Sequence, residues 1–370
     1  MLALPLALAL GFSGAPGLTA YAVPGPLQPA PRAIYRILWH RPLVPTEVLQ
    51  YLPQEAGGVA VDERTGMAVF GTRDGWLHAV LPNQAFVWEH RTHAGFAGPP
   101  TIRDGVVYVG CRDGRIYAID AITGKGLWLY DAREELGTRP LVHDGVLYIA
   151  SMQDTVFAVD AKTGAWKWHH RREGRPGFSI RGQADVIGGG DKVFGAFSDG
   201  TVAALDGATG KPIWERVVAP PGDQTDVDGL AYDGTRLYAA ALSGAVLALD
   251  PKSGSQLWSA KLPGAGRVAA SNGVVYGVGN ASVVALSAAD GGPIWTSPLD
   301  GGWPAATPVL YGRWLVVPSG DGGLRWIEAA SGRTVRVFDP GEGVSGQPAR
   351  AGRRVYVLSN GGDLFALDLR

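Results

Sequence analysis

Short runs of alternating apolar and polar residues, separated by Gly and Asp, extend over most of the chain. In one such run, Arg-Ile-Tyr-Ala-Ile-Asp at 115–120 is followed by a Thr-Gly pair ending at Gly124 and then by Trp128. Short alternating runs rich in β-branched and aromatic residues predict β-strands. The Asp and Gly predict tight turns, because Asp can bond its own following backbone and Gly accepts positive φ.

This unit recurs along the chain. Asp160, Gly164 and Trp168 repeat its spacing, and so do three later copies, which end at Trp214, Trp258 and Trp295. A repeated unit of about forty residues with four strands predicts a β-propeller. The Asp position, which we assign to an inner strand, occurs eight times, at Leu81, Asp120, Asp160, Asp206, Asp250, Ser287, Glu328 and Asp368. We therefore predict an eight-bladed β-propeller of four-stranded antiparallel blades.

The Trp of each unit is predicted to begin the outer strand, where its ring can pack between blades and its N–H can find a partner. The last unit ends at Arg370, before such a strand could form. An unpaired blade edge favours aggregation. Because Ile-Leu-Trp39-His has the outer-strand form, residues 34–43 are predicted to complete the last blade and close the ring.

The N-terminal region differs from the repeats. Residues 1–22 are apolar and end in Ala-Tyr-Ala, which predicts a signal peptide, although no Lys or Arg precedes Arg32. A misplaced start and a simple apolar tail remain alternatives. The apolar run is too short for a transmembrane helix, so no direct membrane span is expected. Residues 23–33 are predicted to be a Pro-rich linker and residues 34–370 the propeller.

Charge and cysteine content narrow the function classes. The chain has 33 Lys+Arg and 34 Asp+Glu, a net charge of −1, which argues against a nucleic-acid partner. Cys111 is the single cysteine, so an internal disulfide and a Cys-rich metal site are excluded. It ends an apolar strand, and we expect it to be a buried small hydrophobe.

The unit Asp-x-x-Thr-Gly-x-x-x-Trp, preceded by Tyr-Ala-hydrophobic-Asp, resembles the PQQ-like (quinoprotein-type) propeller repeat over residues 34–370. Two classes share that repeat: PQQ-dependent dehydrogenases and the BamB family of envelope assembly factors. The dehydrogenases carry adjacent cysteines and a calcium site, which needs several converging oxygen ligands. This chain has one cysteine and no inward cluster of acids that breaks the repeat. We therefore expect no enzyme activity, no PQQ or other cofactor, and no metal.

Two segments are similar to partner-binding segments of the BamB family. Phe178-Ser-Ile180-Arg181-Gly is similar to its Leu-Arg-Gly segment, and Asp226-Val-Asp228 is similar to its Asp-Val-Asp segment. The resemblance implies that Phe178, Ile180, Arg181, Asp226 and Asp228 bind the POTRA domains of a BamA-like partner. Gln183-Ala184 departs from the acidic-small pair that is usual in the family, which puts the detailed contacts in doubt.

Repeat spacing indicates the same segments. From the outer-strand Trp to the next second-strand aromatic there are 20 residues for Trp88 and Trp128, but 26 for Trp168 and 24 for Trp214. We therefore expect two consecutive long loops, side by side on one face, where insertions into a repeat protein usually mark binding. In a purely structural alternative, Asp226 and Asp228 cap a turn and Arg181 braces the loop.

These observations predict a non-catalytic scaffold, periplasmic or associated with the outer membrane. It would resemble BamB and help assemble outer-membrane β-barrel proteins by binding a BamA-like protein. One alternative is a PQQ-like propeller that serves as a sensor or scaffold for another complex, including a cytoplasmic one. The other is a PQQ-dependent dehydrogenase.

Overall fold

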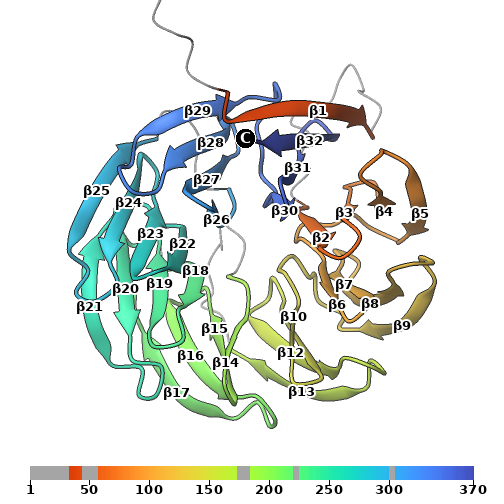
Figure 1. Cartoon of the computed structure of the whole chain (residues 1–370). Coiled ribbons are helices and arrows are strands. Elements are labelled where there is room, and N and C mark those ends of the chain that lie inside the picture. Colours follow the sequence, from red (N-terminus) through yellow and green to blue (C-terminus); the bar gives the residue numbers. More distant parts are fainter. Residues whose placement is uncertain (1–32, 44–56, 173–183, 220–224, 300–304) are drawn as a thin grey trace, which may run out of the picture. The chain divides into compact units, whose positions relative to one another are not determined.

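The computed structural model describes residues 33–43, 57–172, 184–219, 225–299 and 305–370. Within this part of the chain, all regular structure is β-strand. The compact unit Ile34–Arg370 contains eight four-stranded antiparallel sheets. Figure 1 shows these sheets as blades around a ring, so the predicted fold class is confirmed.

Each blade has four consecutive strands, except that the last blade takes its fourth strand from the N-terminal side. The first four blades comprise β2 (Val59–Asp62), β3 (Met67–Gly71), β4 (Trp76–Val80) and β5 (Phe86–Arg91); β6 (Thr101–Arg103), β7 (Val106–Gly110), β8 (Arg115–Asp120) and β9 (Gly126–Asp131); β10 (Leu141–His143), β11 (Val146–Ala150), β12 (Thr155–Asp160) and β13 (Trp166–Arg171); β14 (Ile187–Gly189), β15 (Lys192–Ala196), β16 (Thr201–Asp206) and β17 (Pro212–Val217).

The other four blades continue round the ring. They comprise β18 (Val227–Tyr232), β19 (Leu237–Ala241), β20 (Ala245–Leu249) and β21 (Gln256–Lys261); β22 (Arg267–Ser271), β23 (Val274–Val278), β24 (Ser282–Ser287) and β25 (Pro293–Pro298); β26 (Val309–Tyr311), β27 (Trp314–Ser319), β28 (Gly323–Glu328) and β29 (Thr334–Phe338); β30 (Ala349–Ala351), β31 (Arg354–Leu358), β32 (Asp363–Leu369) and β1 (Tyr35–Pro42).

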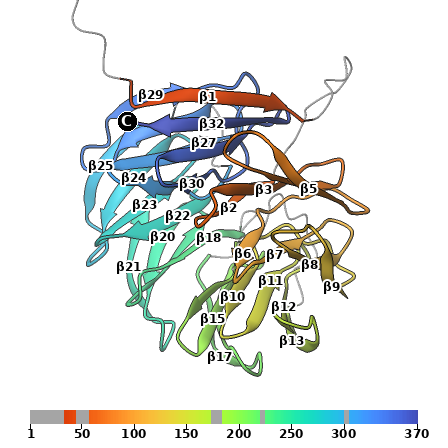
Figure 2. The same ribbon diagram turned by 45° about the vertical axis from the view of Figure 1, so that its right-hand side comes forward.

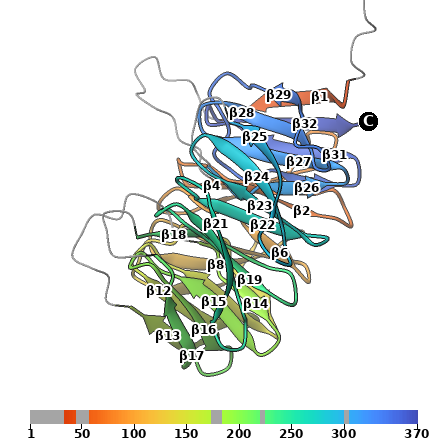
Figure 3. The same cartoon turned by 90° about the vertical axis from the view of Figure 1, so that its left-hand side faces the viewer.

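Strand direction divides the loops between two faces of the ring (Figure 3). The connections between blades, such as 132–140, and the turns between second and third strands, such as 111–114, lie on one face, here called the connection face. The remaining turns, such as 104–105 and 121–125, lie on the opposite face, here called the turn face. The repeated Asp ends the third strand of its blade, not an inner strand as we expected from the sequence.

Each outer-strand Trp contacts the next blade. Trp168 Nε1 donates to the Gly207 carbonyl at 3.0 Å. The Trp168 ring also covers Gly210, where an added Cβ would come within 2.5 Å of ring carbon. The same indole-to-carbonyl bond is made by Trp39, Trp88, Trp128, Trp214, Trp258 and Trp295. The predicted role of the Trp between blades is therefore confirmed.

The Asp-x-x-Thr-Gly turn has the predicted geometry. Asp206 Oδ1 accepts hydrogen bonds from the Thr209 hydroxyl and the Thr209 backbone N–H, at 2.7 and 2.8 Å. These two bonds, that of the hydroxyl first, lower the pKa of Asp206. Gly210 follows at a φ of 71°. Gly210 is thus required for two reasons, its backbone conformation and the Trp168 ring that lies against it.

The hydrophobic core is divided among the blade interfaces. Each of the eight clusters of buried residues draws its side chains from two neighbouring blades. Cys111 lies in the cluster between the first and second blades and is fully buried, as expected. Burial raises the pKa of its thiol to about 11.

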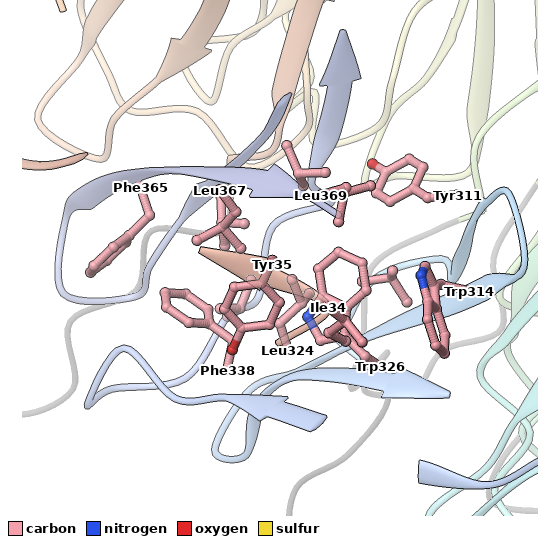
Figure 4. Close-up of a cluster of buried hydrophobic side chains, with 14 residues drawn as sticks. Ile34, Tyr35, Tyr311, Trp314, Leu324, Trp326, Phe338, Phe365, Leu367 and Leu369 are labelled. Atoms are coloured by element: carbon pink, nitrogen blue, oxygen red, sulfur yellow. The ribbon is translucent and has the colours of Figure 1, made fainter. Parts of the chain in front are cut away.

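The ring closes through β1, as predicted. β1 pairs with β32 antiparallel, from Tyr35 opposite Leu369 to Pro42 opposite Asp363 (Figure 2). Tyr35 packs on Trp326 and Phe338 of the seventh blade, with ring centroids 5.4 and 6.0 Å apart (Figure 4).

The seventh blade has Arg336 at the outer-strand Trp position. Its guanidinium lies 5.9 Å from the Tyr35 ring centroid. The interface without an outer-strand Trp therefore has an Arg–Tyr contact in place of the indole bond.

We expect Gly210→Ala to destabilise the protein more than Gly190→Ala. Both glycines have positive φ, 71° and 63°, so each alanine costs roughly 1–2 kcal/mol of backbone strain. No described atom lies within 4 Å of a Cβ at Gly190, whereas Trp168 blocks Gly210, which adds about 1–3 kcal/mol of overpacking. Urea denaturation measures both. Equal free energies of unfolding for the two variants would contradict the packing role.

Deleting residues 34–43 should lower the melting temperature sharply. The deletion removes the buried side chains of Ile34 and Tyr35 and exposes the β32 edge. Each lost large apolar side chain costs about 2–5 kcal/mol. Calorimetry of this variant beside a deletion of residues 24–33 provides the comparison. An unchanged melting temperature in the first variant would refute ring closure by β1.

Cys111 should be unreactive in the folded protein at pH 8. With a thiol pKa of about 11, roughly one thiol in a thousand is ionised, and the sulfur is also shielded from reagent. Reaction with a disulfide reagent should be at least about a hundredfold slower than in urea-unfolded protein. Equal rates would show that the site opens readily.

Candidate protein-binding site

The predicted binding segments precede and follow the fourth blade along the chain. Phe178, Ile180 and Arg181 belong to the 172–186 connection between β13 and β14, and they lie outside the described residues. Asp226 and Asp228 are described, at the start of β18. The mutual geometry of the five residues therefore stays a prediction, and the described ends of the two segments define their surroundings.

The first connection starts from a fixed position. The Arg172 backbone N–H donates to the Asp154 carbonyl at 3.0 Å. Its guanidinium donates to Asp199 Oδ2 through Nε and Nη2, at 2.9 and 2.8 Å, and pairs with Glu215 at 2.9 Å. Charge-assisted bonds of this kind are short and directional. Arg172, six residues before Phe178, is thus fixed on the fourth blade.

The second segment enters a β-bulge. β18 pairs with β19, and the register shifts between Val227 and Gly229, so Asp228 is the extra residue. Asp228 is buried, with 4% exposure, and its carbonyl accepts a hydrogen bond from Arg267 Nη1 at 2.6 Å. Bulges redirect side chains and are frequent next to functional sites. The Asp-Val-Asp stretch is therefore built into an inner strand rather than free on a loop.

Described residues near both segments contact the turn 197–200 between β15 and β16. Asp199 of this turn binds the guanidinium of Arg172, six residues before Phe178. The Ser198 carbonyl accepts a bond from the Thr225 hydroxyl at 2.7 Å, next to Asp226. Arg172 and Thr225 therefore lie beside the same turn of the connection face.

The loop lengths correct part of the spacing analysis. The 172–186 connection is long, but 218–226 is no longer than 92–100 or 132–140. The additional residues between Trp214 and Tyr238 instead lie in β18, which has six residues against three in β6. They also lengthen the following turn, 233–236, on the opposite face. The expectation of two long loops is therefore wrong for the second connection. Spacing from Trp to aromatic cannot distinguish an added loop residue from an added strand residue.

One long connection was missed. Residues 43–58 join β1 to β2 on the connection face. The sequence contains an indication of it, the 31-residue spacing between Trp39 and Phe70. The long connections of this face thus include one beside the ring closure.

Among the described residues, no group of three or more His, Cys, Asp or Glu side chains could hold a metal. A search of the same residues for a helix long and apolar enough to cross a membrane found none.

A family model and a known relative each match most of the chain. A family model described as outer membrane protein assembly factor BamB matches residues 59–244 and 242–370. The outer membrane protein assembly factor BamB of Xanthomonas campestris pv. campestris is 32% identical over 329 residues, which cover 86% of this chain and 79% of the relative.

Solved structures show the same fold. The crystal structure of BamB from Moraxella catarrhalis superposes with a TM-score of 0.75 at 22% identity, covering 91% of this chain and 100% of that one. The quinohemoprotein alcohol dehydrogenase of Comamonas testosteroni also superposes, with a TM-score of 0.68 at 15% identity, over 90% of this chain and 76% of that one. Likeness at these identities concerns the fold alone. The family model and the relative from Xanthomonas campestris decide the family: the chain belongs to the BamB family of outer membrane protein assembly factors.

Proposed function

We propose that this protein is a non-catalytic scaffold of the cell envelope that assists the assembly of outer-membrane β-barrel proteins. The observation that carries the proposal is the match to BamB over most of the chain, to a family model and to a curated relative at 32% identity. The quinoprotein likeness is to the propeller fold, which hosts unrelated functions. We place the protein at the periplasmic side of the outer membrane, where a factor of this kind acts.

The proposed partner is a BamA-like protein, bound through its POTRA domains. Arg181 beside Phe178 and Ile180 is the composition of an interface hot spot, in which a charged group is surrounded by apolar contacts. Asp226 and Asp228 would orient Arg181 or meet a basic group of the partner. The contacts of Arg172 and Thr225 with the turn 197–200 support this proposal, since a fixed base reduces the ordering cost of binding.

Arg181→Ala should weaken binding of purified POTRA domains by about 1–3 kcal/mol, the cost of losing a buried charged hydrogen-bond partner. Titration calorimetry measures the affinity directly, and recovery of the partner from the native envelope tests it in context. Arg103→Ala is the matched control, because Arg103 is an exposed arginine that ends β6 at the turn face.

Three outcomes separately test the proposed site, the proposed partner and export of the protein. Unchanged affinity in Arg181→Ala would reject the proposed site but not the assembly role. Failure to recover a BamA-like protein with the parent chain would reject the partner. N-terminal sequencing of the native protein reports whether residues 1–22 are removed, which an exported scaffold requires and a cytoplasmic one excludes.

A further inference from the structure

A cavity lies along the inner strands of four neighbouring blades. It has a volume of about 690 Å³ and is lined by β2, β6, β26 and β30. More of its lining surface is polar than apolar, and apolar side chains contribute through Val59, Val61, Ile102, Val309, Tyr311 and Pro348. Cavities of this size are typical of small-molecule sites.

Arg139 lies at the connection-face end of this cavity. It belongs to the 132–140 connection, and its Nη2 donates to Gln347 Oε1 in the connection before β30. Gln347 Nε2 donates in turn to the Thr307 carbonyl at 3.3 Å. The Arg139–Gln347 contact joins the connections that precede the third and last blades. It thus fixes the guanidinium at this end of the cavity.

The charge of Arg139 is not balanced by the described residues. None of their carboxylates forms an ion pair with its guanidinium, and Asp185 accepts a bond from its backbone N–H, at 2.8 Å. Its Nε is buried and has no hydrogen-bond partner among them. A buried donor without an acceptor costs free energy.

The opposite end of the cavity adds a second cation. Arg350, on β30, lies 5.7 Å from the Tyr311 ring centroid, and its Nε donates to the Gly352 carbonyl at 2.5 Å. Glu63 is the one acidic residue in the described lining. Two guanidiniums against one carboxylate leave the cavity with an excess positive charge.

We propose that the cavity binds a small organic carboxylate, with Arg139 as the anchor. A planar guanidinium presents donors that match the two oxygens of a carboxylate. The apolar side chains of the lining, such as Ile102 and Val309, would contact the carbon skeleton of the ligand. Arg350 would attract the ligand at the turn face. This site is separate from the proposed partner surface, so either can fail without the other.

The test uses two compounds of the same shape, 1-naphthylacetate and its uncharged amide, 1-naphthylacetamide. Calorimetric titration of the purified full chain should show the acid binding at least about tenfold more tightly than the amide. The preference should decrease as salt screens the guanidinium. Equal affinities, or no binding of the acid at millimolar concentration, would overturn the proposal.

Variants locate the site. Arg139→Gln should weaken naphthylacetate binding at least about tenfold and leave amide binding nearly unchanged. Arg350→Gln, at an exposed position, should weaken acid binding about two- to fivefold. Arg103→Gln on β6 is the control, since this exposed arginine does not line the cavity. If Arg139→Gln fails to fold, as judged by circular dichroism, the acid–amide difference and Arg350→Gln decide. Full acid affinity in both cavity variants would overturn the assignment.

Discussion

The contact on which the ring depends is that between an outer-strand Trp and the turn of the next blade. In one arrangement, the Trp168 indole donates to Gly207 and its ring fills the space left by Gly210. Burial of a large ring and satisfaction of its N–H are achieved together, and the hydrogen bond fixes the ring position. Because the core consists of clusters between blades, each such contact also aligns the apolar faces that form a cluster.

The last blade contacts the first blade through an outer-strand Trp in the same way. Trp39 on β1 donates to the Pro82 carbonyl of the first blade at 3.2 Å, so the N-terminal strand supplies the Trp that the last blade would otherwise lack. At the other side of that blade, Arg336 and Tyr35 replace the indole contact. The aromatic cluster of Tyr35, Trp326 and Phe338 compensates for the missing Trp (Figure 4).

The sequence was sufficient for the fold because the repeat is local. Asp206, Thr209 and Gly210 determine a turn within five residues, and Trp214 then identifies the outer strand. The candidate site was less predictable, because its geometry depends on pairing across strands. The bulge at Asp228 and the six-residue β18 arise from the register with β19, which a count of residues between aromatics cannot reveal. The Arg139–Gln347 contact joins residues 208 positions apart, and no periodic signal points to it.

A propeller of this kind can carry two sites with little interference. The contacts that hold the blades together lie in the outer strands and between sheets, whereas the proposed partner surface and the axial cavity use connections and inner strands. The two sites also differ in access. Arg172 and Thr225, near the partner segments, contact a turn of the connection face, and the cavity extends along inner strands toward Arg350 and Gly352 at the turn face. The Arg139–Gln347 contact joins two connections at the connection-face end of the cavity. A ligand that binds the Arg139 guanidinium would therefore lie at the face that is proposed to bind the partner.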